Sequence, residues 1–133
     1  MRRKVFVRAK KYGRPYFFVF VKLIFNDITY LWRYYRKTLV LIRSFGNIET
    51  QSIWNGNSSK KYPQNIQQVT RRKLRMVNSS HNLNDLRIPP ANHLEKLKGN
   101  LAGFYSIRIN NQWRIIFKWK NSDAYEVEII DYH

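Results

Sequence analysis

The chain has 133 residues, no cysteine, and 25 lysines and arginines against 8 acidic residues, which gives a formal net charge of +17. This length suits one domain with a packed core and is short for two; the lack of cysteine excludes disulfides and thiolate chemistry and fits the cytoplasm. Such a charge favours a polyanionic partner, nucleic acid before a membrane surface, because its field attracts phosphates whatever the fold.

The first 41 residues differ in composition from the rest of the chain. They contain 11 of the lysines and arginines, one acidic residue and many aromatic side chains. Lys22 interrupts their apolar stretch, which is shorter than the roughly 20 residues that a membrane-spanning helix needs. No small-residue cleavage site follows, as a secretory signal would require. Three interpretations remain: a basic arm that contacts nucleic acid, an interfacial membrane helix, or translated sequence upstream of the native start.

From residue 42 the sequence predicts ordinary secondary structure. The run "LIRSF" predicts a short strand that ends at Gly46. Asn47 is a suitable N-cap for a short helix, with Glu49 in its first turn and Gly56 at its end.

A second predicted helix, residues 63–79, is amphipathic. Pro63 suits its first turn. Its apolar residues fall near one face and its cationic residues crowd the remaining surface. The apolar residues are Ile66, Val69, Leu74 and Val77, and the cationic ones are Arg71, Arg72, Lys73 and Arg75. The cationic surface is either solvated or contacts a phosphate-bearing partner.

The last third of the chain predicts an antiparallel meander. Residues 79–93 indicate a loop, because asparagines, serines and a proline pair oppose regular structure. Beyond them, "FYSIRI", "WRIIFKW" and "AYEVEII" each alternate apolar and polar residues with a period of two. Three such runs in succession favour three antiparallel strands.

The loop between the first two of these strands determines their register. Three loop residues, 110–112, keep the apolar residues of both strands on one face, whereas two would mix arginines into the core. Arg108 and Arg114 then emerge together on the other face. Continued alternation in the last strand buries Tyr125, Val127 and Ile129 and places Glu126, Glu128 and Tyr132 on the arginine side. The same surface fits cross-strand ion pairing equally well, with Glu126 and Glu128 neutralising Arg114 and Lys118.

Four segments together resemble one known family. The segments "LIRSFGNIETQSIW", "QQVTRRKLRMVN", "LKGNLAGFYSIRINNQWRIIF" and "DAYEVEIIDYH" resemble the HigB toxins, the plasmid maintenance system killer proteins of the RelE/ParE superfamily. The resemblance runs from about residue 42 to residue 133, which we interpret as a toxin domain, and leaves residues 1–41 as a basic aromatic N-terminal extension. Family members usually begin with methionine where this chain has Leu41. We therefore expect the native protein to begin at Leu41, preceded by translated upstream sequence.

The resemblance implies a fold, an activity and partners. The fold is α+β and RelE/ParE-like, with two N-terminal helices packed on a twisted antiparallel sheet of three to four strands. The activity is that of a metal-independent endoribonuclease, a toxin that cleaves translated mRNA in the ribosomal A site without an organic cofactor. The partners are the ribosome, mRNA and a HigA-like helix-turn-helix antitoxin. The implied compartment is the cytoplasm, and no membrane is expected.

The resemblance also implies site residues, with one departure. The catalytic set carried over is Lys98 of "LKG", Arg114 of "WRI", and Asp131, Tyr132 and His133 at the end of the sequence. Some relatives have a histidine where this chain has Glu95, which can act as a base or be a plain surface acid. His93, two residues earlier, is not expected in the site. The residues expected to bind RNA or the ribosome are Arg71, Arg72, Lys73, Arg75 and Arg108.

The chemistry of RNA cleavage gives these residues roles. Attack of the RNA 2′-hydroxyl on the neighbouring phosphodiester needs a base, an acid, and cations that stabilise the charge of the crowded phosphate. Arg114 can bind two phosphate oxygens at once, and Lys98 adds a point charge. The imidazole of His133 is a group that exchanges protons near neutral pH, and Tyr132 can stack on a base or donate a hydrogen bond. Alternation places Asp131 on the core side, so we expect it to orient its neighbours rather than act as the base.

Two other functions fit parts of the sequence. A ParE-like toxin would inhibit DNA gyrase by binding alone, without the catalytic set. A basic nucleic-acid-binding module would have no activity at all. A zinc site is not expected, because His81, His93 and His133 lie far apart and lack the spacing of metal ligands.

Overall fold

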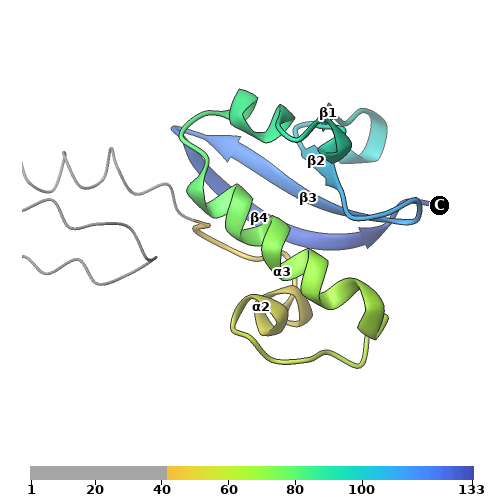
Figure 1. The fold of residues 1–133 in the computed structure, drawn as a ribbon. Coiled ribbons are helices and arrows are strands. Elements are labelled where there is room, and N and C mark those ends of the chain that lie inside the picture. Colours follow the sequence, from red (N-terminus) through yellow and green to blue (C-terminus); the bar gives the residue numbers. More distant parts are fainter. Residues whose placement is uncertain (1–41) are drawn as a thin grey trace, which may run out of the picture. The chain divides into compact units, whose positions relative to one another are not determined.

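Two helices and one sheet form most of the part of the chain that the structure describes. The structure is a computed structural model, and it describes residues 42–133 (Figure 1). Its elements in chain order are α2 (Ile48–Trp54), α3 (Gln64–Ser79), the 3-10 turns η1 (Leu83–Arg87) and η2 (Pro90–Asn92), β1 (Glu95–Lys96), the turn η3 (Gly99–Leu101), β2 (Tyr105–Arg108), β3 (Trp113–Lys120) and β4 (Asp123–Asp131). The extension and the start at Leu41 predicted for residues 1–41 lie outside the described residues. Within them, the predicted α+β class is confirmed.

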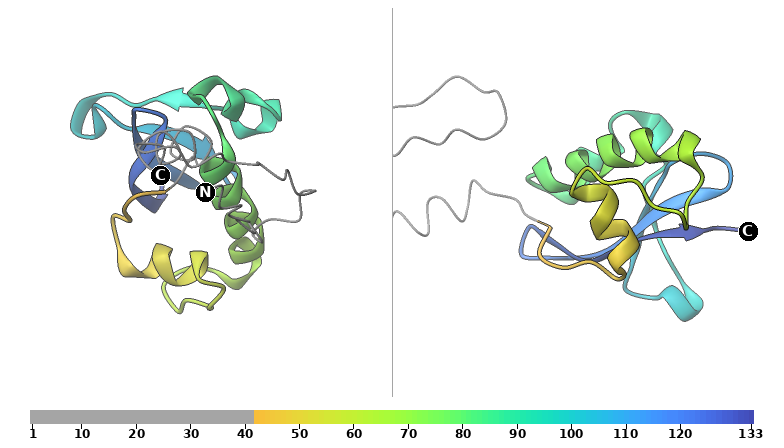
Figure 2. Two further views of the ribbon diagram at one scale, coloured as in Figure 1. Left: turned by 90° about the vertical axis from the view of Figure 1, so that its left-hand side faces the viewer. Right: turned by 90° about the horizontal axis from the view of Figure 1, so that it is seen from below.

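The sheet is antiparallel, with its strands in the order β1-β2-β3-β4. β2, β3 and β4 correspond to the three alternating runs of the sequence, and β1 is a two-residue edge strand that pairs with β2. Both helices pack on one face of this sheet, as two views agree (Figures 1 and 2). The buried residues that they share with the sheet include Ile53, Ile66, Leu74, Val77, Ile107, Ile115, Phe117 and Val127. Among residues 42–133, no helix is both long and apolar enough to cross a membrane.

The predicted register of β2 and β3 is confirmed. Arg108 pairs with Arg114 and Ile107 pairs with Ile115 across the two strands. The side chain of Asn110 closes the three-residue loop by accepting two backbone hydrogen bonds, at 2.9 and 2.8 Å. Since both isoleucines are fully buried, the two arginines leave the sheet on the opposite face.

A bulge in β4 changes the predicted pattern of that strand. The pairs Ile116 with Glu128 and Lys118 with Tyr125 leave one extra residue on the β4 side. Glu126 lies at this point with a φ of 50°. The extra residue reverses the alternation before it, so Ala124 is fully buried and Tyr125 is opposite Lys118. The prediction that Tyr125 faces the core is therefore wrong, whereas Val127 and Ile129 are buried as predicted.

Residues 42–46 run beside β4 without forming the predicted strand. Two isolated parallel bridges join Ile42 to Ala124 and Phe45 to Val127. The bulge interrupts the ladder between them, and there the backbone N–H of Glu126 donates to Ser44 Oγ at 2.9 Å instead. A continuous strand needs an unbroken neighbour, so this prediction was wrong for a reason that lies in β4.

The helices begin close to their predicted positions. Asn47 caps α2, because its Oδ1 accepts from the backbone N–H of Thr50 at 2.7 Å. Pro63 precedes α3 as its cap residue rather than lying in its first turn. Residues 79–93 are less irregular than predicted, since they contain η1 and η2, and a capping box between Asn82 and Asp85 closes the start of η1.

Candidate active site

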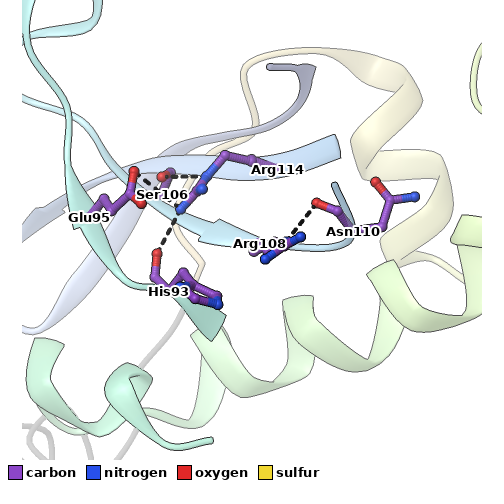
Figure 3. Close-up of polar contacts among 6 residues, drawn as sticks. All are labelled: His93, Glu95, Ser106, Arg108, Asn110 and Arg114. Carbon is purple, nitrogen blue, oxygen red and sulfur yellow. Dashed lines mark hydrogen bonds and ion pairs between the residues drawn. The ribbon is translucent and has the colours of Figure 1, made fainter. Parts of the chain in front are cut away.

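Arg114, in β3, is only 6% exposed, because its side chain is surrounded by contacts from several parts of the chain. Its Nε donates to Ser106 Oγ at 2.8 Å and its Nη2 donates to the backbone carbonyl of His93 at 2.6 Å (Figure 3). Glu95 Oε2 lies 3.5 Å from Nη2, and the guanidinium carbon lies 4.9 Å from the ring centroid of Tyr132. Within residues 42–133, Nη1 donates no hydrogen bond, so an incoming anion can bind there.

The alternative explanation of this surface as ion pairing holds only in part. Lys118 pairs with Glu126 as that explanation requires. Glu128 instead accepts a hydrogen bond from the asparagine that caps α2. The carboxylate beside Arg114 belongs to Glu95, from a different strand. The arginine is therefore not neutralised by the last strand.

A hollow of about 590 Å³ opens beside the end of the chain. Its lining comprises Lys73 of α3, Ala91 of η2, His93, Arg108 and Ile109 at the end of β2, the loop residues 110–112, and His133. This volume is within the roughly 300 to 1,000 Å³ of typical small-ligand sites. One arginine, one lysine, two histidines and the loop amides together fit an anion such as a phosphate. The hollow thus brings together three predicted residues: Lys73, Arg108 and His133.

Gln112 makes hydrogen bonds to Asp131 and Tyr132, near the end of β4. Its Nε2 donates to Asp131 Oδ2 at 2.8 Å, and its backbone carbonyl accepts from Tyr132 at 2.7 Å. The backbone N–H of His133 donates to Asp131 Oδ1 at 3.1 Å. The hydrogen bond from Gln112 and then that from His133 hold the pKa of Asp131 below its ordinary value of 3.8. A lower pKa makes a carboxylate a weaker base, which agrees with an orienting role.

Lys98 and Glu95 are among the predicted residues that do not line the hollow. Lys98 is exposed just before η3, and within residues 42–133 its side chain makes no hydrogen bond or ion pair. Gly99 follows it with a φ of 64°, a left-handed conformation that glycine adopts without steric cost. Glu95 contacts Arg114 but does not line the hollow.

The cationic residues of α3 have three different environments. Arg71 donates to the backbone carbonyl of Ile53 in α2 at 2.9 Å and to that of Asn57 in the following loop at 3.3 Å, and so connects α3 to α2. Lys73 Nζ donates to Asn92 Oδ1 at 2.6 Å; burial, and then the neighbouring charge of Arg72, lower its pKa. Arg72 and Arg75 are exposed. Only these last two form the free cationic back that the amphipathic pattern predicts.

His93, which was not expected in the site from the sequence, lines the hollow. It has a left-handed backbone, with φ 42° and ψ 58°, directly after η2. Its position in the hollow depends on how η2 folds back towards β2 and the end of the chain, which no local pattern reveals. Among residues 42–133, no three histidine or acidic side chains gather where they could hold a metal ion.

Comparisons with known proteins point to one family. A family model described as "RelE-like toxin of type II toxin-antitoxin system HigB" matches residues 44–133. An uncharacterized protein of Haemophilus influenzae is 48% identical over 69 residues, which are 52% of this chain and 68% of that protein. Toxin HigB-1 of Vibrio cholerae is 47% identical over 62 residues, 47% of this chain and 65% of its own. Endoribonuclease HigB of Proteus vulgaris is 45% identical over 40 residues, 30% of this chain and 44% of its own.

Solved structures are similar to the chain at a coarser level. The YoeB-YefM complex from Staphylococcus aureus contains a chain that aligns with a TM-score of 0.46 and 19% identity. The alignment covers 69% of this chain and 97% of that one.

Proposed function

This chain belongs to the family of HigB-like, RelE-like toxins of type II toxin-antitoxin systems, and from that premise we propose that it is an endoribonuclease that cleaves translated mRNA in the ribosomal A site. The RelE/ParE-like form of the fold, an extension before residue 42 and a HigA-like helix-turn-helix antitoxin belong to the same proposal. The reaction requires no metal or organic cofactor, and it takes place in the cytoplasm, where ribosomes translate.

The observation that carries this proposal is the basic hollow at the end of β4. His133, Lys73 and Arg108 line one space, and Arg114 is paired with Arg108 across β2 and β3, with Tyr132 against it. A phosphodiester in such a position meets cations that stabilise the charge of the crowded phosphate and an imidazole that exchanges protons. Tyr132, which is 48% exposed, is free to stack on a base. Lys98 supplies a further charge from its exposed loop.

The proposal is tested by mapping mRNA 5′ ends in bacterial cells that express the full chain. Two reporter transcripts are compared that differ only in the start codon, so that one is translated and its twin is not. We expect new ends inside the translated coding region and none in the twin. Cutting of both transcripts would indicate a nuclease that does not need the ribosome.

The same experiment separates the other candidate functions. Growth inhibition without new ends, but with induction of the DNA-damage response, would favour a gyrase inhibitor of the ParE type. Growth inhibition with neither response would favour a binding module without activity. Either result would contradict the proposed nuclease.

Reversing two exposed charges of α3 is expected to weaken binding to the ribosome. The double variant Arg72→Glu and Arg75→Glu removes two cations that face solvent. We expect lower affinity of the full chain for ribosomes, and a plot of log affinity against log salt whose slope is shallower by about two, one for each phosphate that is no longer neutralised. Filter binding at several salt concentrations measures both quantities.

Arg71→Glu is the matched comparison for this variant. Its side chain donates to carbonyls of the preceding helix and loop, so we expect its reversal to lower the thermal midpoint, unlike the reversal of Arg72 and Arg75. Unchanged affinity and an unchanged salt slope in the double variant would remove the claim that α3 contacts ribosomal RNA.

A further inference from the structure

His93 both contacts Arg114 and lines the hollow. Its carbonyl oxygen accepts the 2.6 Å hydrogen bond from Arg114, and the residue lines the same hollow as His133. Figure 3 shows the carbonyl turned to Arg114 and the ring turned away from it, on the side of Arg108. The left-handed backbone of His93 makes this arrangement possible. Non-glycine residues in this conformation are uncommon and cluster at functional sites.

We propose that His93 and His133 are the acid–base pair of the cleavage reaction, an inference that rests on the proposed function. The neutral imidazole of one removes the proton of the 2′-hydroxyl, and the 2′ oxygen attacks phosphorus. The bond between phosphorus and the 5′ oxygen breaks, and that oxygen takes a proton from the imidazolium of the other. The products are a 2′,3′-cyclic phosphate and a 5′-hydroxyl end. The two imidazoles have then exchanged protonation states, and solvent restores them.

Glu95 is less suited to be the second proton-transfer group. Its carboxylate lies 3.5 Å from Arg114, and its side chain is 47% exposed. It does not line the hollow in which His133 lies. A base must come within hydrogen-bonding reach of the proton it removes. A carboxylate paired with the guanidinium serves better to orient Arg114 than to take up protons.

The charged groups around the pair favour binding of a phosphate in the hollow that His93 and His133 line. Lys73 faces the hollow from α3 and Arg108 from the end of β2. On the backbone side of His93 lie Arg114 and Glu95, and next to His133 lies the Asp131 carboxylate. Arg72 and Arg75 are exposed on α3. Apart from Asp131 and Glu95, all of these groups are cationic.

The variant His93→Asn removes the imidazole and keeps the backbone. Asparagine tolerates the left-handed conformation better than most residues, so the carbonyl bond to Arg114 is retained. We expect single-turnover cleavage of mRNA on programmed ribosomes to fall by about 100-fold or more, as for the loss of a general acid or base. The bell-shaped pH profile of the wild type should lose one limb in His93→Asn and the opposite limb in His133→Asn. His81→Asn, at an exposed histidine outside the hollow, is the control with the wild-type profile.

A second variant separates chemistry from structure. His93→Gly also permits the left-handed backbone and leaves space for a free imidazole, so added imidazole should restore part of its cleavage. A His93→Asn protein that cleaves at the wild-type rate, or keeps both limbs, would overturn the pair while leaving the proposed function intact. The pair would also be overturned if the His93 variants cleave more slowly but His93→Asn keeps both limbs of the pH profile and imidazole does not rescue His93→Gly. A wild-type chain that cleaves no mRNA on the ribosome would overturn both proposals together.

Discussion

Replacing Arg114 with lysine is expected to lower the rate of mRNA cleavage by about 100- to 1,000-fold, the usual cost of removing one preorganised donor to a developing oxyanion. The guanidinium uses Nε for Ser106 and Nη2 for the carbonyl of His93, and it still offers Nη1 to a phosphate. A single ammonium cannot occupy all three positions, because lysine has one nitrogen and no planar fork. The charge would be kept, so a loss of this size would show that geometry rather than charge matters.

Single-turnover cleavage on programmed ribosomes measures this effect, with the thermal midpoint measured in parallel to show that the variant is folded. The matched control is Arg43→Lys, a change at an ion pair with Asp123 (3.1 Å) far along the chain from the site. We expect less than about a twofold change there, as for most substitutions near the surface. An Arg114→Lys protein that is folded and cleaves like the wild type would show that Arg114 does not bind the reacting phosphate.

The arrangement of the arginines could be predicted from the sequence, because it depends on local pattern alone. Side chains alternate in a strand, and a one-residue slip would move every apolar residue of β2 or β3 to the wrong face. The pairing of Arg108 with Arg114 follows from this and from the three-residue loop. Tyr132 lies beside Arg114 for the same reason.

The bulge in β4 could not be predicted in this way. Its positive-φ residue is Glu126, and a glycine or asparagine, the residues that usually mark such a conformation, is absent at that position. Unbroken alternation through this point assigns Tyr125 to the core, whereas the structure has Ala124 there.

The contacts that side chains make with distant parts of the chain likewise could not be predicted from the sequence pattern. The periodicity of α3 correctly separates an apolar from a cationic face, but it does not reveal that Arg71 binds the end of α2 or that Lys73 reaches Asn92. The association of His93 with His133 depends on residues 40 positions apart in sequence lining one hollow. Only part of the site can therefore be predicted from the sequence. The positions of the strand residues follow from the pattern, whereas those of the residues in and next to η2 do not.

Replacing Asn92 with alanine is expected to lower the free energy of unfolding by about 3 kcal/mol, since each buried polar group left without a partner costs about 1 to 3 kcal/mol. Asn92 is fully buried. Its Nδ2 donates to the carbonyls of Leu86 at 3.0 Å and Ile88 at 3.4 Å, and its Oδ1 accepts from Lys73 Nζ at 2.6 Å. Alanine would leave two carbonyls and a half-buried ammonium unpaired. For a domain that is stable by only about 5 to 15 kcal/mol, this is a large fraction.

Denaturant unfolding of the full chain measures the loss, and Asn84→Ala is the matched control. Asn84 is exposed, and within residues 42–133 its side chain makes a single hydrogen bond, which it accepts from Arg87, so its loss should be small. Lys73→Met removes the ammonium and keeps most of the side-chain stem, so Asn92→Ala should cost less in that background, by about 0.5 to 3 kcal/mol for a coupled pair. Equal costs in both backgrounds would show that Asn92 supports only the turns around η1 and η2. A smaller cost in the Lys73→Met background would show that Asn92 also holds Lys73 at the hollow. One buried amide would then position both Lys73 and the adjacent His93, two basic residues that line the hollow.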